Sequence, residues 1–218
     1  MELNGKHALI TGSSRCIGRG IALALAENGV KVAVHYYQNE AAAKETLSKV
    51  RERGSDGFLV QADVLNLAQI PEMFLKVKTE FGKLDIFVAN ARPEAATFFQ
   101  PPLDITLKQW DTAFDSQAKA FLVCVREALP LMSEGGRIFA ITYAEGSRTG
   151  GHQPWVGMGA AKAALEIMRQ SRIDWLRKRC LQLVDLFRDG AQSRHVLLFI
   201  AAAFFVVNNG ETFSESLC

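Results

Sequence analysis

Two side chains in the second half of the sequence could move a proton together, the phenol of Tyr143 and the ammonium of Lys162. An ammonium beside a phenol lowers the pKa of the phenol and makes it a better proton donor near neutral pH. Met158, four residues before the lysine, has no proton to donate. Trp155 carries an indole N–H that can hydrogen-bond to an oxygen but does not readily release its proton. We therefore predict that Tyr143 is the donor; the alternative is a residue that only walls a substrate pocket.

A glycine-rich segment near the N-terminus could bind a diphosphate. It reads Thr11-Gly12-Ser13-Ser14-Arg15-Cys16-Ile17-Gly18, directly after a short apolar run and directly before a helical pattern. Glycines there allow a tight turn and a close approach of the backbone to a ligand. The N-terminus of the following helix supplies N–H donors and a partial positive charge. The segment therefore predicts a dinucleotide site, with a plain strand-to-helix turn as the alternative.

These residues need a scaffold that brings them together, and the pattern of the chain predicts one. Apolar runs of strand length alternate with amphipathic helical patterns up to about residue 168. The predicted strands cover residues 7–10, 31–36, 57–61, 84–89 and 137–142. The predicted helices cover residues 17–28, 40–53, 70–81 and 107–132, and a further helix starts near Gly157 and passes Lys162.

Continuous apolar strands separated by helices predict an α/β fold, a Rossmann-like doubly wound parallel sheet with helices on both faces. The length of 218 residues fits one domain, residues 1–218. Ligands in such sheets bind beyond the carboxyl ends of the strands, and each motif described here follows a strand. We therefore treat the motifs as parts of one site.

The residues after the second strand indicate which dinucleotide is preferred. This strand ends in Tyr36, and no Asp or Glu follows it up to Asn39. A carboxylate there would bind a ribose 2′-hydroxyl and repel a 2′-phosphate. Its absence, together with the guanidinium of Arg15, favours NADP(H) over NAD(H). The alternative for Arg15 is a solvated surface charge.

The motifs, in their order and spacing, resemble those of the short-chain dehydrogenase/reductase family. The matching elements are the glycine-rich turn, Asp63-Val64, Leu84-Asp85 and Asn90-Ala91. The resemblance covers residues 1–168 and implies that Asp63-Val64 borders the adenine and that Asn90-Ala91 lines the cofactor. With the turn and the lysine, the predicted cofactor-binding residues are Gly12, Ser14, Arg15, Ile17, Gly18, Tyr36, Asp63, Val64, Asn90, Ala91 and Lys162.

Within the family, the region from Ile141 to Lys162 is similar to the enoyl-acyl-carrier-protein reductase branch. That branch carries a Ser-Tyr pair after the fifth strand and a Tyr-x6-Lys arrangement. Here Tyr143 and Lys162 are kept, and Trp155 stands at the second tyrosine position, where it would shape an acyl pocket. The resemblance implies an NADPH-dependent reductase of enoyl thioesters in fatty-acid synthesis. Its partners would be an acyl thioester, acyl carrier protein and further copies of the chain in a homo-oligomer.

Three residues depart from the family pattern. Cys16 replaces the middle glycine of the turn, and a positive φ at this position would destabilise the fold by about 1 kcal/mol or more. Its thiol is either a small passive hydrophobe or, at a helix N-terminus, a reactive group. Arg92 stands where a glycine usually follows Asn-Ala, and Gln117 lies near a position at which many members place a catalytic asparagine. An amide that is merely structural is the alternative for Gln117.

Composition argues against several other classes of function. The net charge is +2 and the basic residues are scattered, which does not favour a nucleic-acid surface. The histidines and the four cysteines show no metal-ligand spacing, so we expect no metal and free thiols in a reducing, cytoplasmic compartment. The longest apolar run, residues 196–207, is short of the roughly 20 residues that a membrane helix needs, so we expect no membrane contact.

The last fifty residues carry none of the later signals of the family. Residues 169–218 form a divergent tail without a recognisable sixth strand, and the apolar run at 196–207 is a candidate replacement strand. A coding sequence read out of frame would give the same abrupt change. Two alternatives to enoyl reduction therefore stay open, a ketoacyl or other carbonyl reductase and a catalytically idle nucleotide-binding protein.

Overall fold

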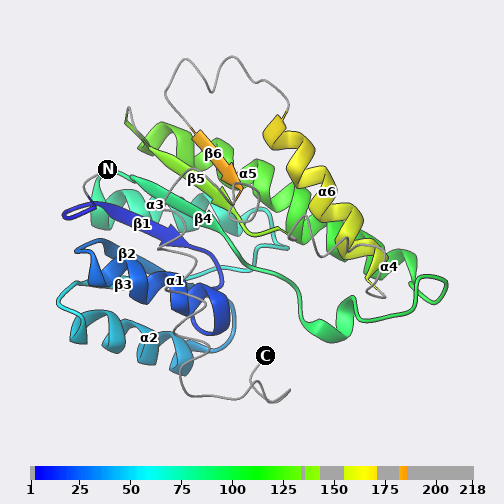
Figure 1. Ribbon diagram of the computed structural model, residues 1–218, viewed down its shortest axis with the longest axis horizontal. Helices are drawn as coiled ribbons and strands as arrows, with labels where there is room; N and C mark the ends of the chain where they lie inside the picture. The colour runs from blue at the N-terminus through cyan, green and yellow to red at the C-terminus, as the bar shows by residue number, and fades with distance from the viewer. Residues whose placement is uncertain (1–2, 134–135, 143–154, 171–181, 186–218) are drawn as a thin grey trace.

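The computed structural model describes residues 3–133, 136–142, 155–170 and 182–185. Its centre is a parallel sheet with the strand order β3-β2-β1-β4-β5-β6, shown in Figure 1. The strands are β1 (His7–Ile10), β2 (Lys31–Tyr36), β3 (Gly57–Gln61), β4 (Ile86–Ala89), β5 (Arg137–Ala140) and β6 (Gln182–Asp185). From β1 the sheet continues through β2 to β3 at one edge, and from β4 it continues through β5 to β6 at the other edge. This arrangement is typical of a doubly wound fold.

The helices alternate with the strands along the chain. They are α1 (Cys16–Glu27), α2 (Glu40–Glu52), α3 (Gln69–Phe81), α4 (Leu107–Phe114), α5 (Ala120–Ala128) and α6 (Val156–Gln170), with short turns η1 (Ala95–Thr97), η2 (Asp115–Lys119) and η3 (Leu129–Leu131). The predicted strands at 7–10, 31–36 and 57–61 are confirmed without a shift. The predicted Rossmann-like fold is therefore correct.

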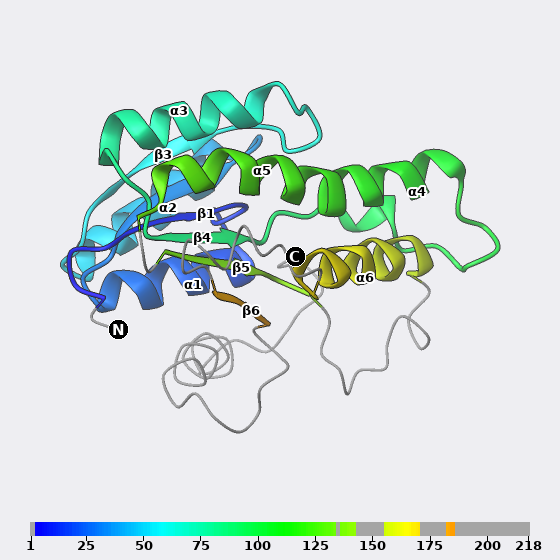
Figure 2. The same ribbon diagram turned by 90° about the horizontal axis from the view of Figure 1, so that it is seen from above.

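The two faces of the sheet are covered by different helices. Alternation along β1 shows how: Leu9 packs in the cluster that contains residues of α3 and α5, whereas Ala8 and Ile10 pack in the cluster that contains residues of α1 and α2. Figure 2 shows α3 and α5 on one side of the sheet and α1 on the other. Both faces are buried, which explains why the strands are continuously apolar.

The strands predicted at 84–89 and 137–142 are each two residues shorter in the structure, and two further elements differ in kind from the sequence prediction. The helix predicted over 107–132 is interrupted by η2, a π-helical turn between α4 and α5. The divergent tail does contain a strand, because β6 pairs in parallel with β5. Residues 182–185 are too short a pattern, with Asp185 at one end, to stand out in the sequence. The alternative strand predicted at 196–207 lies outside the described residues.

Candidate active site

The turn between β1 and α1 has the tight geometry that the glycines suggest. Gly12 has a φ of +67°, a left-handed conformation that favours glycine. A Cβ on Gly18 would lie 2.4 Å from the Gly12 carbonyl oxygen and 2.7 Å from Nδ2 of Asn90. A side chain at Gly18 would therefore collide with the turn and with Asn90, and a side chain at Gly12 would strain the backbone.

Cys16 adopts the positive φ that the sequence analysis considered for it. Its φ is 49°, and it is the one non-glycine residue with a positive φ that is found in the described part of the chain. Its side chain is exposed at the start of α1. A thiol-bearing residue therefore occupies a backbone conformation better suited to glycine, which is a local strain.

A hydroxyl and an amide tie this turn to the end of β4. Oγ1 of Thr11 accepts hydrogen bonds from the backbone N–H of Asn90 at 2.9 Å and of Ala91 at 3.0 Å, and donates to the Val88 carbonyl at 3.3 Å. The Asn90 side chain donates to the carbonyls of Thr11 at 2.8 Å and Gly12 at 3.2 Å. Thr11, Gly12, Gly18 and Asn90 thus form one connected unit.

The next residues of the turn are held by side chains of α1 and α2. The Ser14 carbonyl accepts hydrogen bonds from the guanidinium of Arg19, at 3.2 and 2.9 Å, and from Oγ1 of Thr46 at 2.9 Å. Arg15 and Ile17 follow on the surface, and the Ile17 side chain is 52% exposed. Arg15 therefore presents its charge to solvent beside the turn.

The residues assigned to the adenine side lie at the ends of β2 and β3. Tyr36 is the last residue of β2 and is mostly buried in the cluster under α1 and α2. Asp63 follows β3, where its backbone N–H donates to Gln69 and its carboxylate accepts from the Leu65 N–H. Val64 is half-buried beside it. The structure thus places these residues along the same sheet edge as the glycine-rich turn.

Lys162 is buried on α6 and reaches the end of β5. Its ammonium donates a hydrogen bond to the Ile141 carbonyl, one residue beyond β5. Burial, and then the nearby charge of Arg92, lower the pKa of Lys162 to about 8, while Glu166 acts in the opposite direction. A lysine with this pKa is charged at neutral pH and loses its charge in mildly alkaline solution.

Met158, which has no proton to donate, occupies the tyrosine position of the Tyr-x-x-x-Lys pattern. Met158 is buried on α6, one helical turn before Lys162. The predicted donor, Tyr143, lies outside the described residues. Thr142, which precedes it, donates a hydrogen bond to the carboxylate of Glu166.

Trp155 belongs to an aromatic cluster at the start of α6. Its ring lies 4.6 Å from that of Phe99 and 5.8 Å from that of Phe98, between centroids. Arg92 lies over the Phe98 ring, 5.6 Å from its centroid. Phe99 is 46% exposed, and Trp155 is partly exposed. The tryptophan is therefore one side of an apolar surface that carries a cation, as a pocket wall would be.

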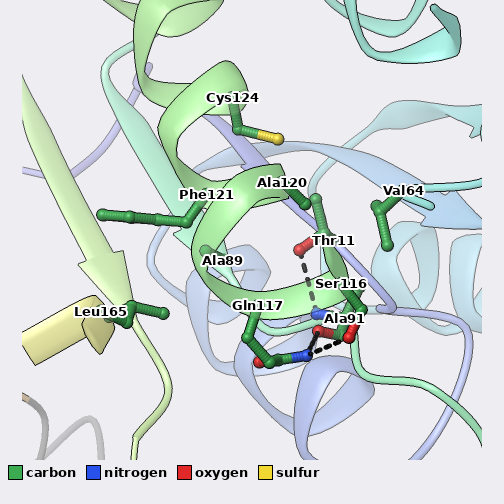
Figure 3. A pocket seen from close by; sticks show the side chains of 10 residues that line it. All are labelled: Thr11, Val64, Ala89, Ala91, Ser116, Gln117, Ala120, Phe121, Cys124 and Leu165. Atoms are coloured by element: carbon green, nitrogen blue, oxygen red, sulfur yellow. Dashed lines mark hydrogen bonds between the residues drawn. The ribbon is translucent and has the colours of Figure 1, made fainter. Parts of the chain in front are cut away.

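A small pocket lies between the glycine-rich turn, α5 and α6, and Figure 3 shows it from close by. Nε2 of Gln117, in η2, donates to the Ala91 carbonyl at 3.2 Å and lies 3.3 Å from Oγ of Ser116. The π-helical turn thus aims the amide of Gln117 at the backbone that follows β4. The pocket is lined by Thr11, Val64, Ala89, Ala91, Ser116, Gln117, Ala120, Phe121, Cys124 and Leu165.

Sequence reasoning missed Ser116, Cys124 and Leu165 as parts of this region. Cys124 is buried, and burial raises the pKa of its thiol to about 12, so the thiol stays protonated. No local signal could have found Ser116 and Cys124, because η2 alters the helical phase between α4 and α5. Leu165 reaches the region from α6, through a contact between elements that are distant in the sequence. Within the described ranges, no group of three or more His, Cys, Asp or Glu side chains is placed to hold a metal. No helix within those ranges has the length and apolarity to cross a membrane.

Comparison with known proteins gives the chain its relatives. Residues 12–172 match a family model described as enoyl-(acyl carrier protein) reductase. The chain is 37% identical over 159 residues to 1-cyclohexenylcarbonyl-CoA reductase of Streptomyces collinus, a match that covers 73% of this chain and 55% of that protein. It is 31% identical over 214 residues to versicolorin reductase 1 of Aspergillus parasiticus, covering 98% of this chain and 79% of that protein.

Solved structures give the same result. The landomycin C-6 ketoreductase LanV, determined with bound NADP and rabelomycin, superposes with a TM-score of 0.78 at 28% identity, covering 94% of this chain and 89% of that one. The match to the Streptomyces protein spans little more than half of that protein's length. The long family match and the relative that covers nearly all of this chain establish that it belongs to the short-chain dehydrogenase/reductase family.

Proposed function

We propose that the chain is an NADPH-dependent reductase that acts on a carbonyl group. One observation carries this proposal: the buried ammonium of Lys162 is fixed at the end of β5, on the same sheet edge as the glycine-rich turn. A cofactor held by the turn and a charged group beside it are the two requirements of hydride transfer to a polarised bond.

The residues of the turn fit a dinucleotide. Gly12 and Gly18 let the backbone of the turn pack closely against Asn90 and fold tightly, and α1 directs its N-terminus to the same place. Arg15 is exposed beside the turn, and β2 is followed by no acidic residue up to Asn39, which supports NADP(H). The bound NADP in the LanV structure supports the same choice. When bound, NADPH supplies a hydride.

The chain itself would supply the proton and the stabilisation of charge. Lys162, positive at neutral pH, would bind the nicotinamide ribose and stabilise negative charge on the substrate oxygen. Tyr143, two residues after Ile141, would donate the proton to that oxygen. Its phenol becomes a better donor when the lysine ammonium lowers its pKa.

The aromatic cluster of Phe98, Phe99 and Trp155 supports a ring-containing substrate. Phe98 is buried, but Phe99 is 46% exposed and Trp155 is partly exposed, and such aromatic faces bind flat apolar molecules by stacking. The guanidinium of Arg92 nearby attracts an electron-rich or anionic oxygen. Two relatives are named for such compounds, versicolorin reductase and the ketoreductase bound to rabelomycin. We therefore favour a ketone on a ring system as the substrate.

Reduction of an enoyl thioester is the second candidate. It is supported by the description of the matching family model and by the relative named for 1-cyclohexenylcarbonyl-CoA. In that reaction, hydride adds to the β-carbon and negative charge grows on the thioester oxygen, so Lys162 and Tyr143 would keep their roles. Acyl carrier protein would then be a partner.

NADPH consumption with a ring ketone and with a crotonyl thioester separates the two candidates. Faster turnover of the ketone is expected, and Tyr143→Phe should lower kcat by about a hundredfold or more, in the range of general-acid catalysis. Turnover of the thioester alone would support enoyl reduction. Binding of NADPH without turnover of either substrate would support a catalytically idle nucleotide-binding protein. Equal rates in wild type and Tyr143→Phe would show that the tyrosine is not the proton donor.

A further inference from the structure

His35 is a buried histidine that the proposed mechanism does not use. It lies in β2, is only 2% exposed, and stands where the ends of three strands meet. Nδ1 of its ring is 2.8 Å from the backbone nitrogen of Gly12, and Nε2 is 3.1 Å from the carbonyl oxygen of Ala62. One imidazole thus bridges the turn after β1 and the residue that follows β3.

The two partners of the ring determine its tautomer. The backbone N–H of Gly12 can only donate, so Nδ1 must accept and carries no hydrogen. The carbonyl of Ala62 can only accept, so the hydrogen lies on Nε2. A doubly protonated ring would place a donor against the Gly12 N–H. Burial is the main cause that lowers the pKa of His35, to about 4, so the ring is neutral at physiological pH.

The main chain of His35 holds the following residue of the turn. The Ser13 N–H donates to the His35 carbonyl at 3.0 Å, and Oγ of Ser13 accepts from the His35 N–H at 3.0 Å. Gly12 is therefore fixed on both sides, its N–H by His35 and its carbonyl by Asn90. These contacts set the φ of +67° at Gly12, from which the chain enters α1.

We propose that His35 is a positioning residue for the nicotinamide cofactor, and that its neutral Nε2–H tautomer holds the Gly12 amide so that the turn is formed before the cofactor binds. This inference rests on the proposed function, because it assigns the turn to the diphosphate. A turn that is already formed lowers the entropic cost of cofactor binding, because fewer residues have to be ordered when the cofactor binds. Loss of the acceptor at Nδ1 therefore weakens cofactor binding and leaves the chemistry of the bound complex intact.

Asparagine and leucine at position 35 form a matched pair for the test. The two side chains have nearly the same shape, and Oδ1 of asparagine stands where Nδ1 of histidine stands. His35→Leu should raise the Kd for NADPH, measured by calorimetry, by about tenfold, and His35→Asn should stay close to wild type. At saturating NADPH, the kcat of both variants should equal that of wild type.

His7→Leu is the control for a general loss of stability. His7 is the first residue of β1 and lies at the amino-terminal ends of the strands, away from the glycine-rich turn. This variant should therefore keep the wild-type Kd. Equal Kd values for His35→Leu and His35→Asn would overturn the proposal. A wild-type chain that is folded but binds no NADPH would instead overturn the proposed function.

The tautomer can be measured on the wild-type protein, which removes any dependence on the folding of a variant. Long-range proton–nitrogen NMR spectra distinguish the two neutral forms of a histidine ring. The proposal requires His35 to be protonated on Nε2 near neutral pH, with the Gly12 amide protected from hydrogen exchange before NADPH is added. A ring protonated on Nδ1, or a Gly12 amide that exchanges freely, would disprove it.

Discussion

At the scale of single residues, the strained backbone of Cys16 destabilises the fold. Its φ of 49° is unfavourable for any residue with a Cβ, so Cys16→Gly should stabilise the fold by about 1 kcal/mol. For a chain of this length, such a gain raises the melting temperature by about 2–4 °C. Thermal unfolding followed by circular dichroism measures it.

The neighbouring residue provides the control for Cys16→Gly. Arg15 has a φ of −158°, which is ordinary extended backbone, so Arg15→Gly removes no strain and should not raise the melting temperature. If both glycine variants melted at the same temperature, the positive φ at Cys16 would not be a source of strain.

Lys162 gives the reaction an expected pH dependence. In the proposed function the lysine must be charged to bind the ribose and stabilise an oxyanion, and its pKa in the folded chain is about 8. The value of kcat/KM for NADPH, which reports on the free enzyme, should therefore fall as the pH rises through about 8. Steady-state rates across neutral and alkaline pH measure the midpoint of this decline.

Two charge-neutralising variants test whether this midpoint belongs to Lys162. The positive charge of Arg92 lowers the lysine's pKa, so Arg92→Gln should move the midpoint upward. The carboxylate of Glu166 raises it, so Glu166→Gln should move the midpoint downward. A midpoint that stays in place in both variants would assign the decline to another group.

At the scale of elements, the hydroxyl of Thr11 joins β1 to the residues after β4. Thr11→Val keeps the shape of the side chain but leaves the N–H groups of Asn90 and Ala91 without their acceptor in a mostly buried place. An unsatisfied buried group destabilises a fold by about 1–3 kcal/mol, so urea unfolding should show a loss of about 2 kcal/mol or more.

Thr11→Ser retains the hydroxyl and serves as the matched variant. It should recover most of the stability that Thr11→Val loses, and it should also keep the affinity for NADPH. Equal losses in the two variants would mean that the methyl group of Thr11, and not its hydrogen bonds, stabilises this junction.

The elements also show how far sequence reasoning reaches. Strand and helix positions up to β4 could be predicted because each apolar run lies between clear turn residues, such as Gly29, Gly54 and Gly82, all with positive φ. The π-helical turn η2 could not, because one continuous amphipathic pattern spans residues 107–132. The contacts of His35 could not either, since they join residues from three strands and depend on the register of the sheet.

For the candidate site, the sequence was informative about backbone and less so about side-chain environments. The roles of Gly12, Gly18 and Asn90 in the turn follow from residue type and position, and the structure brings the three together. The lowered pKa of Lys162 depends on its burial and on the nearby charge of Arg92, which local sequence does not encode. The roles of Tyr143 and Trp155 in catalysis stay predictions.

At the scale of the whole molecule, His35 links stability to pH. Its pKa is 6.5 in an unfolded chain and about 4 in the fold, so the unfolded chain takes up the proton first. The contribution of His35 is therefore complete above pH 6.5 and is lost as the pH falls towards about 4, by on the order of a few kcal/mol. Urea unfolding at a series of pH values measures this slope.

His35→Asn does not titrate at this position and should unfold with a much smaller pH dependence across the same window. His7→Asn is the comparison, because burial also lowers the pKa of His7. A slope that His7→Asn abolishes and His35→Asn leaves unchanged would show that the wrong histidine had been chosen.

The order of the strands in the sheet determines which parts of the site are synthesised first. When the ribosome has added Ala91, it has already made β1 to β4, which are contiguous in the sheet and carry the glycine-rich turn with its anchors. Lys162 is added much later, with α6. A nascent chain would thus hold every residue of the proposed diphosphate site before the lysine proposed for catalysis has been synthesised.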